Sequence, residues 1–200
     1  MSPLFYDFAK VSVRMFARVV WRARVYGTKN VPATGPLLIA CNHVSYLDPP
    51  LLGALCPRRI SYMAKKELFT LPVLGGVIRA LGAYAVDRGG SATAAIKRSL
   101  QVLDAGGVVG IFPEGRRNLT GDAIPQTGVG LLAVRAQAPV VPACIRGTDR
   151  ALRLAQINVA FGEPLAPPTG RKATRGDLEK FTSEIMKSID MLAERIGGNT

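Results

Sequence analysis

The chain has 200 residues, and its 26 Lys and Arg against 14 Asp and Glu give a formal net charge of +12 at pH 7. This length suits one domain with a buried core, and 48% hydrophobic residues exclude disordered and coiled-coil classes. A single histidine excludes a metal site built from several histidines, and three cysteines beside apolar residues are expected to be free, buried thiols. The positive charge predicts an anionic partner: nucleic acid, an acidic membrane surface or a phosphorylated small molecule.

Residues 4–25 are predicted to form an amphipathic helix, because apolar side chains recur at helical spacing beside a basic stripe. The apolar positions are Phe8, Val11, Met15 and Val19, and the basic positions are Lys10, Arg14, Arg18 and Arg22. Trp21 and Tyr26 near the end of this segment are residue types that favour a membrane–water interface. A membrane-associating helix is therefore expected, and an ordinary surface helix docked on the core is the alternative.

Residues 1–30 carry six basic residues and one acidic residue, so they supply +5 of the net charge. The sequence has neither a secretory signal nor an apolar stretch long enough to cross a bilayer. We therefore expect residues 1–26 to hold the chain peripherally on the cytoplasmic face of the cell membrane, ahead of a domain formed by residues 27–200.

Beyond this segment, short apolar runs alternate with helical patterns. This alternation predicts a single α/β domain with a mixed, largely parallel sheet flanked by helices. The expected strands are 36–41, 60–64, 83–86, 108–112, 140–145 and 157–161. The expected helices are 50–56, 72–80, 91–105, 127–137 and 174–196.

The segment 42–49 (NHVSYLDP) follows the first of these strands and carries the first candidate chemistry. His43 would lie at the carboxyl end of that strand, where ligands bind in open α/β sheets. Asp48 can fold back onto the ring, fix its tautomer and leave the other nitrogen as a base. No G-x-S-x-G elbow is present, and Ser45 is too near His43 to be assumed to complete a triad. The economical interpretation is that His43 deprotonates a substrate hydroxyl, although structural His–Asp pairs are also common.

A second group of polar residues follows the expected strand 108–112. Arg116 and Arg117 could bind phosphate through their guanidinium forks, and Glu114 could lock one fork or contact a substrate hydroxyl. Lys65 and Arg88 follow two other strands. Cations at successive strand ends favour one anion site over a set of solvated basic turns.

Taken in order, these blocks resemble the glycerolipid acyltransferase family, which includes the bacterial 1-acylglycerol-3-phosphate acyltransferases. The resemblance covers residues 27–162, and four blocks in the correct order make it specific. The matching positions are Asn42, His43 and Asp48 (N-H-x-x-x-x-D), 65–68 (K-x-E-L), 82–88 (an apolar strand ending in Arg), 112–117 (F-P-E-G-x-R) and 141–145 (V-P-x-x-I).

The resemblance implies an enzyme that moves a fatty acyl group from acyl-CoA or acyl-carrier protein to the 2-hydroxyl of 1-acylglycerol 3-phosphate (lysophosphatidic acid), making phosphatidic acid. His43 would be the base and Asp48 would orient it, with no acyl-enzyme. No metal or cofactor beyond the thioester co-substrate is expected. The implied substrate-binding residues are Lys65, Arg88 and Arg117 for the acceptor phosphate and Glu114 for bracing the site or contacting the glycerol. Backbone N–H groups near Gly115 are expected to donate to the oxyanion.

Two positions depart from the family pattern. Asn118 stands where the family commonly has Ser, and Gln126 stands where many members have Lys. Arg116 could compensate for that missing lysine. Glycerol 3-phosphate or another lysophospholipid remains open as the acceptor, and an inactive membrane adaptor is a further alternative. A basic nucleic-acid-binding protein is disfavoured by 6% aromatic residues and the lack of a nucleic-acid module, so no nucleic acid is expected as a partner.

Overall fold

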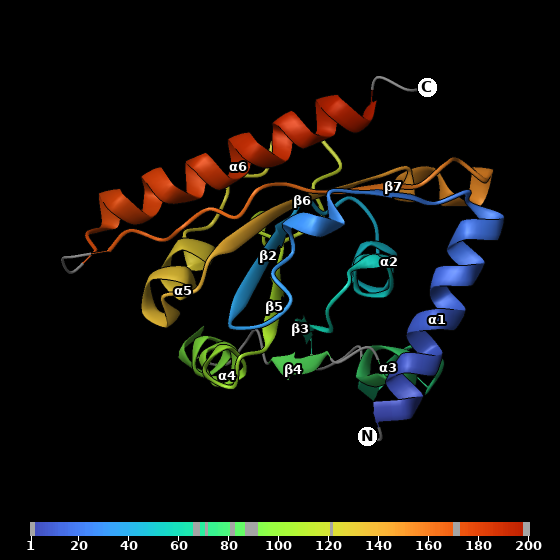
Figure 1. The fold of residues 1–200 in the computed structure, drawn as a ribbon, viewed down its shortest axis with the longest axis horizontal. Coiled ribbons are helices and arrows are strands. Elements are labelled where there is room, and N and C mark those ends of the chain that lie inside the picture. Colours follow the sequence, from blue (N-terminus) through green and yellow to red (C-terminus); the bar gives the residue numbers. More distant parts are fainter. Residues whose placement is uncertain are drawn as a thin grey trace.

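A seven-stranded sheet with helices on both faces forms the centre of the protein in a computed structural model (Figure 1), which describes residues 3–65, 69–70, 72–80, 83–86, 92–120, 122–169 and 173–197. The strand order is β1-β7-β6-β2-β5-β3-β4, and every neighbouring pair is parallel except β6 and β7. The predicted single α/β domain with a mixed, largely parallel sheet is therefore confirmed.

The predicted elements downstream of residue 30 are confirmed to within one or two residues at each end. The strands are β1 (Arg24–Tyr26), β2 (Leu37–Cys41), β3 (Ile60–Lys65), β4 (Tyr84–Val86), β5 (Val108–Ile111), β6 (Val140–Arg146) and β7 (Asn158–Phe161). The helices are α1 (Pro3–Val20), α2 (Asp48–Leu55), α3 (Pro72–Ala80), α4 (Ala92–Asp104), α5 (Gly128–Ala136) and α6 (Arg175–Gly197), with 3₁₀ turns η1 (Thr28–Asn30) and η3 (Thr148–Arg153).

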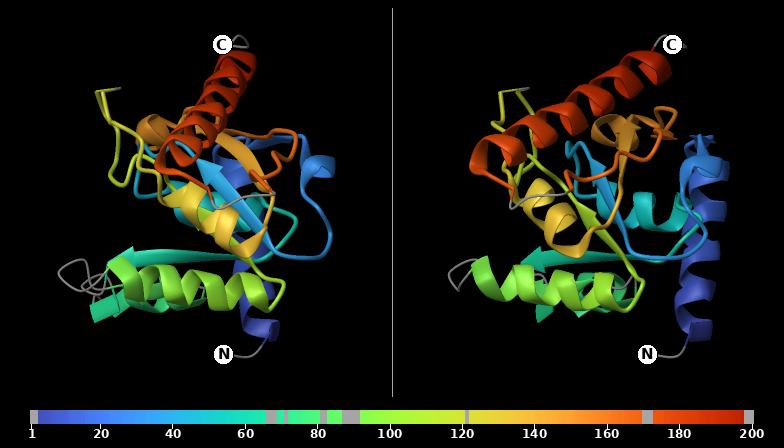
Figure 2. Two further views of the ribbon diagram at one scale, coloured as in Figure 1. Left: turned by 90° about the vertical axis from the view of Figure 1, so that its left-hand side faces the viewer. Right: turned by 60° about the vertical axis from the view of Figure 1, so that its left-hand side comes forward.

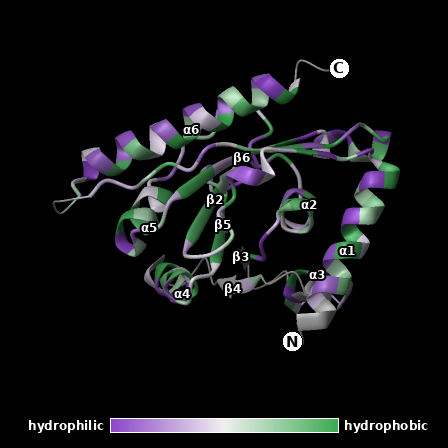
Figure 3. Cartoon of the chain, viewed as in Figure 1, coloured by the Kyte–Doolittle hydropathy of each residue, from purple (hydrophilic) through white to green (hydrophobic). Residues whose placement is uncertain are grey.

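The central strands are apolar throughout because both faces of the sheet are covered. All five residues of β2 are buried, as are all four of β5, and both strands are hydrophobic in Figure 3. Helices α1 and α2 pack on one face, whereas α4, α5 and α6 pack on the other (Figure 2). A parallel sheet covered on both sides needs continuous apolar strands rather than alternating ones. This is why these strands could be located from the sequence.

The predicted N-terminal helix is too long at its carboxyl end. It stops at Val20, and Arg22 has a left-handed φ of 48°. Residues Arg24–Tyr26 then form β1, which pairs in parallel with β7. The sheet thus begins within the segment predicted as a separate helix, because a partner strand far downstream outweighs local helical spacing.

The apolar face of α1 points to solvent. Phe8, Val11, Met15 and Val19 are between 55% and 73% exposed. The helix docks through its other side, where Ala17 is fully buried. Helix α1 is therefore docked on the core, as the alternative expects, but its apolar face is left exposed, and membrane association stays a prediction. None of the described helices is long and apolar enough to span a membrane.

Two residues of the predicted basic stripe face the protein rather than solvent. Lys10 Nζ donates to the Pro57 carbonyl at 3.1 Å, and Arg14 Nη2 donates to the Leu55 carbonyl at 3.2 Å. The Leu55 carbonyl is the last of α2 and the Pro57 carbonyl lies two residues beyond it, so both cations lie near the negative end of the helix dipole. Arg18 remains exposed on α1.

Candidate active site

The site lies at the edge of the sheet where the parallel strands β2, β5 and β6 end. The loop after β2 carries His43 and Asp48, and the turn after β5 carries Glu114. Neighbouring parallel strands present their carboxyl ends at the same edge, so residues far apart in the chain meet there. Asn42 ties this edge together. Its Nδ2 donates to the Ile145 carbonyl on β6 at 3.0 Å, and its Oδ1 accepts the Ile145 N–H at 2.8 Å.

His43 and Asp48 form the predicted pair. His43 Nδ1 lies 2.9 Å from Asp48 Oδ2, and the N–H groups of Val44 and Ser45 donate to the same oxygen at 2.7 Å each. Asp48 is fully buried as the first residue of α2, where the helix dipole favours an anion. Because a carboxylate oxygen only accepts, Nδ1 carries the proton and Nε2 keeps a lone pair. The geometry supplies a general base.

The imidazole plane is fixed by aromatic contacts. The ring of His43 stacks on Phe112 with centroids 4.3 Å apart and planes at 28°, and Phe112 in turn lies 6.1 Å from the buried Tyr62 ring. With Nδ1 held by Asp48 and one ring face covered, the imidazole has a single orientation. A base whose position is fixed in this way loses little entropy when substrate binds.

Glu114 braces the main chain of His43. Its Oε2 accepts the His43 N–H at 2.8 Å, and its Oε1 accepts Asn118 Nδ2 at 3.2 Å. The Asn118 N–H closes the network by donating to the His43 carbonyl at 2.6 Å. We expected Glu114 to lock an arginine or reach the substrate, but its hydrogen bonds in the described part of the chain go to His43 and Asn118. Asn118, the departure from the family serine, therefore takes part in the site.

Burial raises the pKa of Glu114 above its usual 4.5, while hydrogen bonds from Asn118 and the His43 N–H oppose this shift. A raised carboxyl pKa means that the folded state binds more protons than the unfolded state between the two pKa values. Protonation of Glu114 therefore adds to the free energy of unfolding in full below pH 4.5, and this addition is lost as pH rises through the folded-state pKa.

Replacing Glu114 with glutamine removes this titration. As pH rises from the unfolded-state to the folded-state pKa of Glu114, wild type should lose stability and E114Q should not. The unfolding free energy of E114Q should therefore rise relative to that of wild type. Urea titrations from about pH 4 to pH 8 measure this difference. Parallel pH curves for the two proteins would contradict a raised Glu114 pKa.

Arg117 contacts the loop that carries His43. Its guanidinium lies 3.8 Å from the centre of the Tyr46 ring, and its Nη2 donates to the Tyr46 hydroxyl at 3.0 Å. Arg116 is exposed, and its nearest acidic partner in the described residues is Asp122 at 4.0 Å. Tyr46 was not predicted as a site residue, because its partner is 71 positions away. The stacked guanidinium is pre-oriented to meet an anion.

The other predicted residues are placed as follows. Lys65 is the last residue of β3, and Arg88 lies outside the described residues. Gly115 turns the chain after β5 with a φ of 67°, and a side chain there would collide with Gln126. The Gly115 N–H donates to the Phe112 carbonyl at 2.9 Å. The Gly115 N–H is thus engaged within the turn, and oxyanion donors among the backbone N–H groups near Gly115 stay a prediction.

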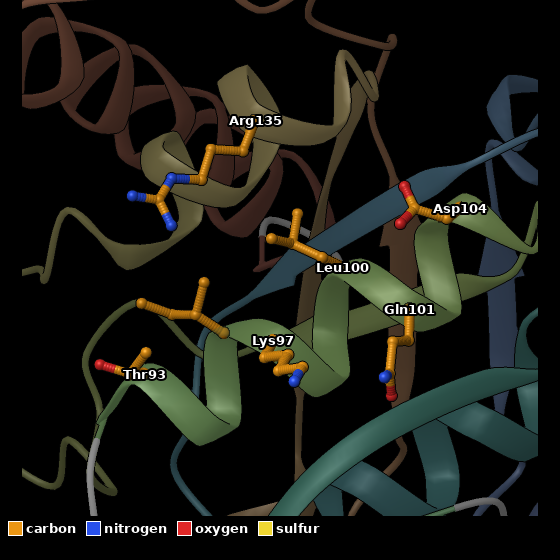
Figure 4. A pocket seen from close by; sticks show the side chains of 7 residues that line it. Thr93, Lys97, Leu100, Gln101, Asp104 and Arg135 are labelled. Carbon is orange, nitrogen blue, oxygen red and sulfur yellow. The ribbon is translucent and has the colours of Figure 1, made fainter.

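The described part of the structure has two pockets to consider. One of about 380 Å³ lies beside the Glu114 turn and is lined by Glu114, Gly115, Arg116, Asp122, Ile124 and Gln126. The other, of about 460 Å³, lies between α4 and α5 (Figure 4) and includes neither His43 nor Asp48. Among the described residues, no group of three His, Cys, Asp or Glu side chains could hold a metal ion.

Comparisons with known proteins find both a family and individual relatives that resemble this chain. The sequence pattern of the family described as Acyltransferase matches residues 22–146. The 1-acyl-sn-glycerol-3-phosphate acyltransferase of Bacillus subtilis is 33% identical over 165 residues, which cover 80% of this chain and 82% of that protein. The human 1-acyl-sn-glycerol-3-phosphate acyltransferase beta is 34% identical over 60% of this chain and 45% of its own.

A solved structure shares the fold. The crystal structure of PlsC, the 1-acyl-sn-glycerophosphate (LPA) acyltransferase of Thermotoga maritima, matches with a TM-score of 0.70 and 21% identity. The match covers 94% of this chain and 81% of that one. The fold is thus similar over nearly the whole chain.

Proposed function

Since this chain belongs to the acyltransferase family, we propose that it transfers a fatty acyl group from acyl-CoA or acyl-carrier protein to the 2-hydroxyl of 1-acylglycerol 3-phosphate. The product would be phosphatidic acid, a precursor in phospholipid biosynthesis. The observation that carries the proposal is His43, whose Nδ1 is bound by Asp48 and whose main chain is held by Glu114. The names of the relatives support the choice of acceptor.

The geometry suits direct transfer. Nε2 of His43 takes the proton of the acceptor hydroxyl, and the oxygen attacks the thioester carbonyl, forming a C–O bond. The tetrahedral intermediate then collapses, the C–S bond breaks, and the thiolate leaves with the proton returned by the imidazolium. The Asp48 carboxylate stabilises the imidazolium between these steps. No protein nucleophile is needed, because the thioester is already activated.

A transfer assay tests the proposal. Purified protein is given labelled acyl-CoA or acyl-carrier protein with lysophosphatidic acid, glycerol 3-phosphate or lysophosphatidylcholine. We expect the highest kcat/KM with lysophosphatidic acid. Faster acylation of another acceptor would overturn the substrate assignment, and no transfer to any acceptor would favour an inactive adaptor.

Arg117 would bind the acceptor phosphate, together with Lys65 and Arg88. We expect R117A to raise the acceptor KM by about 10–100-fold, because a hydrogen bond to a charged group is worth about 1.5–3 kcal/mol. R116A is the matched control, since Arg116 is exposed and lacks the Tyr46 contact. An equal rise in KM for R116A would mean that both guanidinium groups bind the phosphate, with Arg116 compensating for Gln126.

The exposed apolar face of α1 supports a peripheral location on an anionic membrane, which we place on the cytoplasmic face. Phe8, Val11, Met15 and Val19 would enter the interface, and Arg18 would meet lipid phosphates. Flotation with vesicles containing phosphatidylglycerol tests this, with a V11D, V19D double variant as the negative control. Strong salt-dependent binding to oligonucleotides without vesicle binding would instead favour a nucleic-acid-binding protein.

A further inference from the structure

The 3₁₀ turn η3 and the residue after it expose two leucines at the carboxyl edge of the sheet. Leu152 is 102% exposed and Leu154 is 56% exposed. η3 follows directly after β6, the strand whose Ile145 is bound by Asn42 beside His43. The turn is therefore attached to the same end of the sheet as the base.

This turn is joined to the carboxyl end of α1. Trp21 Nε1 donates to the Ala151 carbonyl at 2.9 Å, and Arg22 Nη2 donates to the Leu154 carbonyl at 3.3 Å. The exposed Phe16 of α1 packs edge-on against Trp21, with ring centroids 5.3 Å apart. Trp21 thus connects Phe16 of α1 to η3, and Figure 1 shows the segment before β7 beside the end of α1.

The charge around this tip is positive. Arg150 and Arg153 of η3 are exposed, and Arg18 is exposed on α1. The one acidic residue in the η3 sequence, Asp149, is 3.7 Å from Arg150. Exposed leucines among arginines, beside a tryptophan, match the chemistry of an anionic bilayer surface: apolar groups enter the acyl boundary while guanidinium groups meet phosphates.

We propose that η3 is a second bilayer contact, with Leu152 as its inserting residue. This inference rests on the proposed function, in which the enzyme works at a membrane. Because η3 lies at the carboxyl end of α1 and follows β6, this second contact extends the bilayer-facing surface from α1 to the carboxyl edge of the sheet, which carries His43.

Site-directed fluorescence tests the contact. The native cysteines Cys41, Cys56 and Cys144 are buried, so a polarity-sensitive maleimide dye will label L152C selectively. M191C is the control, because Met191 is an apolar residue, 61% exposed, on α6 across the sheet from α1. We expect vesicles containing phosphatidylglycerol to blue-shift the dye at L152C only, and brominated lipids to quench it. Equal responses at both positions, or none at L152C, would overturn the proposal.

Binding variants separate this inference from the proposed function. L152D should weaken vesicle binding by about tenfold, the effect of withholding one leucine from the interface. L152D should leave acylation of a soluble short-chain lysophosphatidic acid unchanged, and an unaltered thermal melt shows that the variant folds.

The pattern of binding across the variants separates the two proposals. If the V11D, V19D double variant abolishes vesicle binding while L152D binds like wild type, the η3 contact is wrong and the membrane assignment stands. If neither variant alters binding, both the α1 and the η3 contacts are wrong, and if wild type itself does not bind the vesicles, the membrane assignment fails. Concentration-dependent dimers of wild type that L152D abolishes, without vesicle binding, would assign the surface to a second copy of the chain.

Discussion

Replacing His43 with alanine is expected to lower kcat for acyl transfer by about 10²–10⁴-fold, the usual contribution of a positioned general base. In the imidazole, Nδ1 lies 2.9 Å from Asp48 Oδ2, which leaves Nε2 to take the proton of the acceptor. Because H43A removes no backbone donor or acceptor, the Glu114 and Asn118 hydrogen bonds to the main chain of residue 43 persist. The acceptor KM should therefore change much less than kcat.

A serine variant in the same loop is the matched control. The Ser45 hydroxyl accepts the Leu47 N–H at 3.3 Å, and the Ser45 N–H, which binds Asp48, is kept in S45A. S45A should therefore retain most of the activity. If S45A were as inactive as H43A and an acyl-enzyme accumulated in wild type, direct transfer would be wrong. An H43A enzyme that worked at the wild-type rate would overturn the assignment of the base.

The sheet and the His43–Asp48 pair could be predicted because their signals are local. A fully buried strand such as β2 is an unbroken apolar run, and the pair lies within one short loop. β1 could not be found in the same way. It is three residues long and carries Arg24 in a basic segment, and only its pairing with β7 makes it a strand.

The interactions that hold the site together were also beyond sequence reasoning. Glu114 binds a main-chain N–H 71 residues away, and Arg117 finds Tyr46 at the same separation. An N–H group is present at nearly every residue, so no side-chain pattern marks the one that will be used. The direction of the α1 apolar face was likewise undetermined, because helical spacing shows that a face exists but not whether core or solvent receives it.

Asp48 offers the sharpest test of how the base is held. Its Oδ2 receives three donors: His43 Nδ1 and the N–H groups of Val44 and Ser45. In D48N the two backbone donors can be satisfied only if the amide oxygen takes the place of Oδ2. The oxygen would then still accept from Nδ1–H, so the tautomer is kept while the negative charge is lost.

We therefore expect D48N to lower kcat by about 10–100-fold, the value of a charge-assisted hydrogen bond. D48A should lower it by more than D48N does, up to the about 10²–10⁴-fold loss expected for H43A, because Asp48 acts through the imidazole. D48A also leaves two backbone donors unpaired, which should cost about 2–4 kcal/mol of unfolding free energy. D48N avoids much of that cost, so its kinetics can be measured on a folded protein.

The tautomer can be observed directly, because His43 is the only histidine of the chain. Its two ring nitrogens give unambiguous signals in a ¹H–¹⁵N correlation spectrum that reports which of them carries the proton. We expect the neutral ring to carry its proton on Nδ1 in both wild type and D48N, and a mixture of tautomers in D48A. An Nε2–H tautomer in D48N, accompanied by a loss of activity as large as that of D48A, would mean that the amide turns its nitrogen toward the ring. In that case the backbone donors of Val44 and Ser45 do not control the orientation of residue 48.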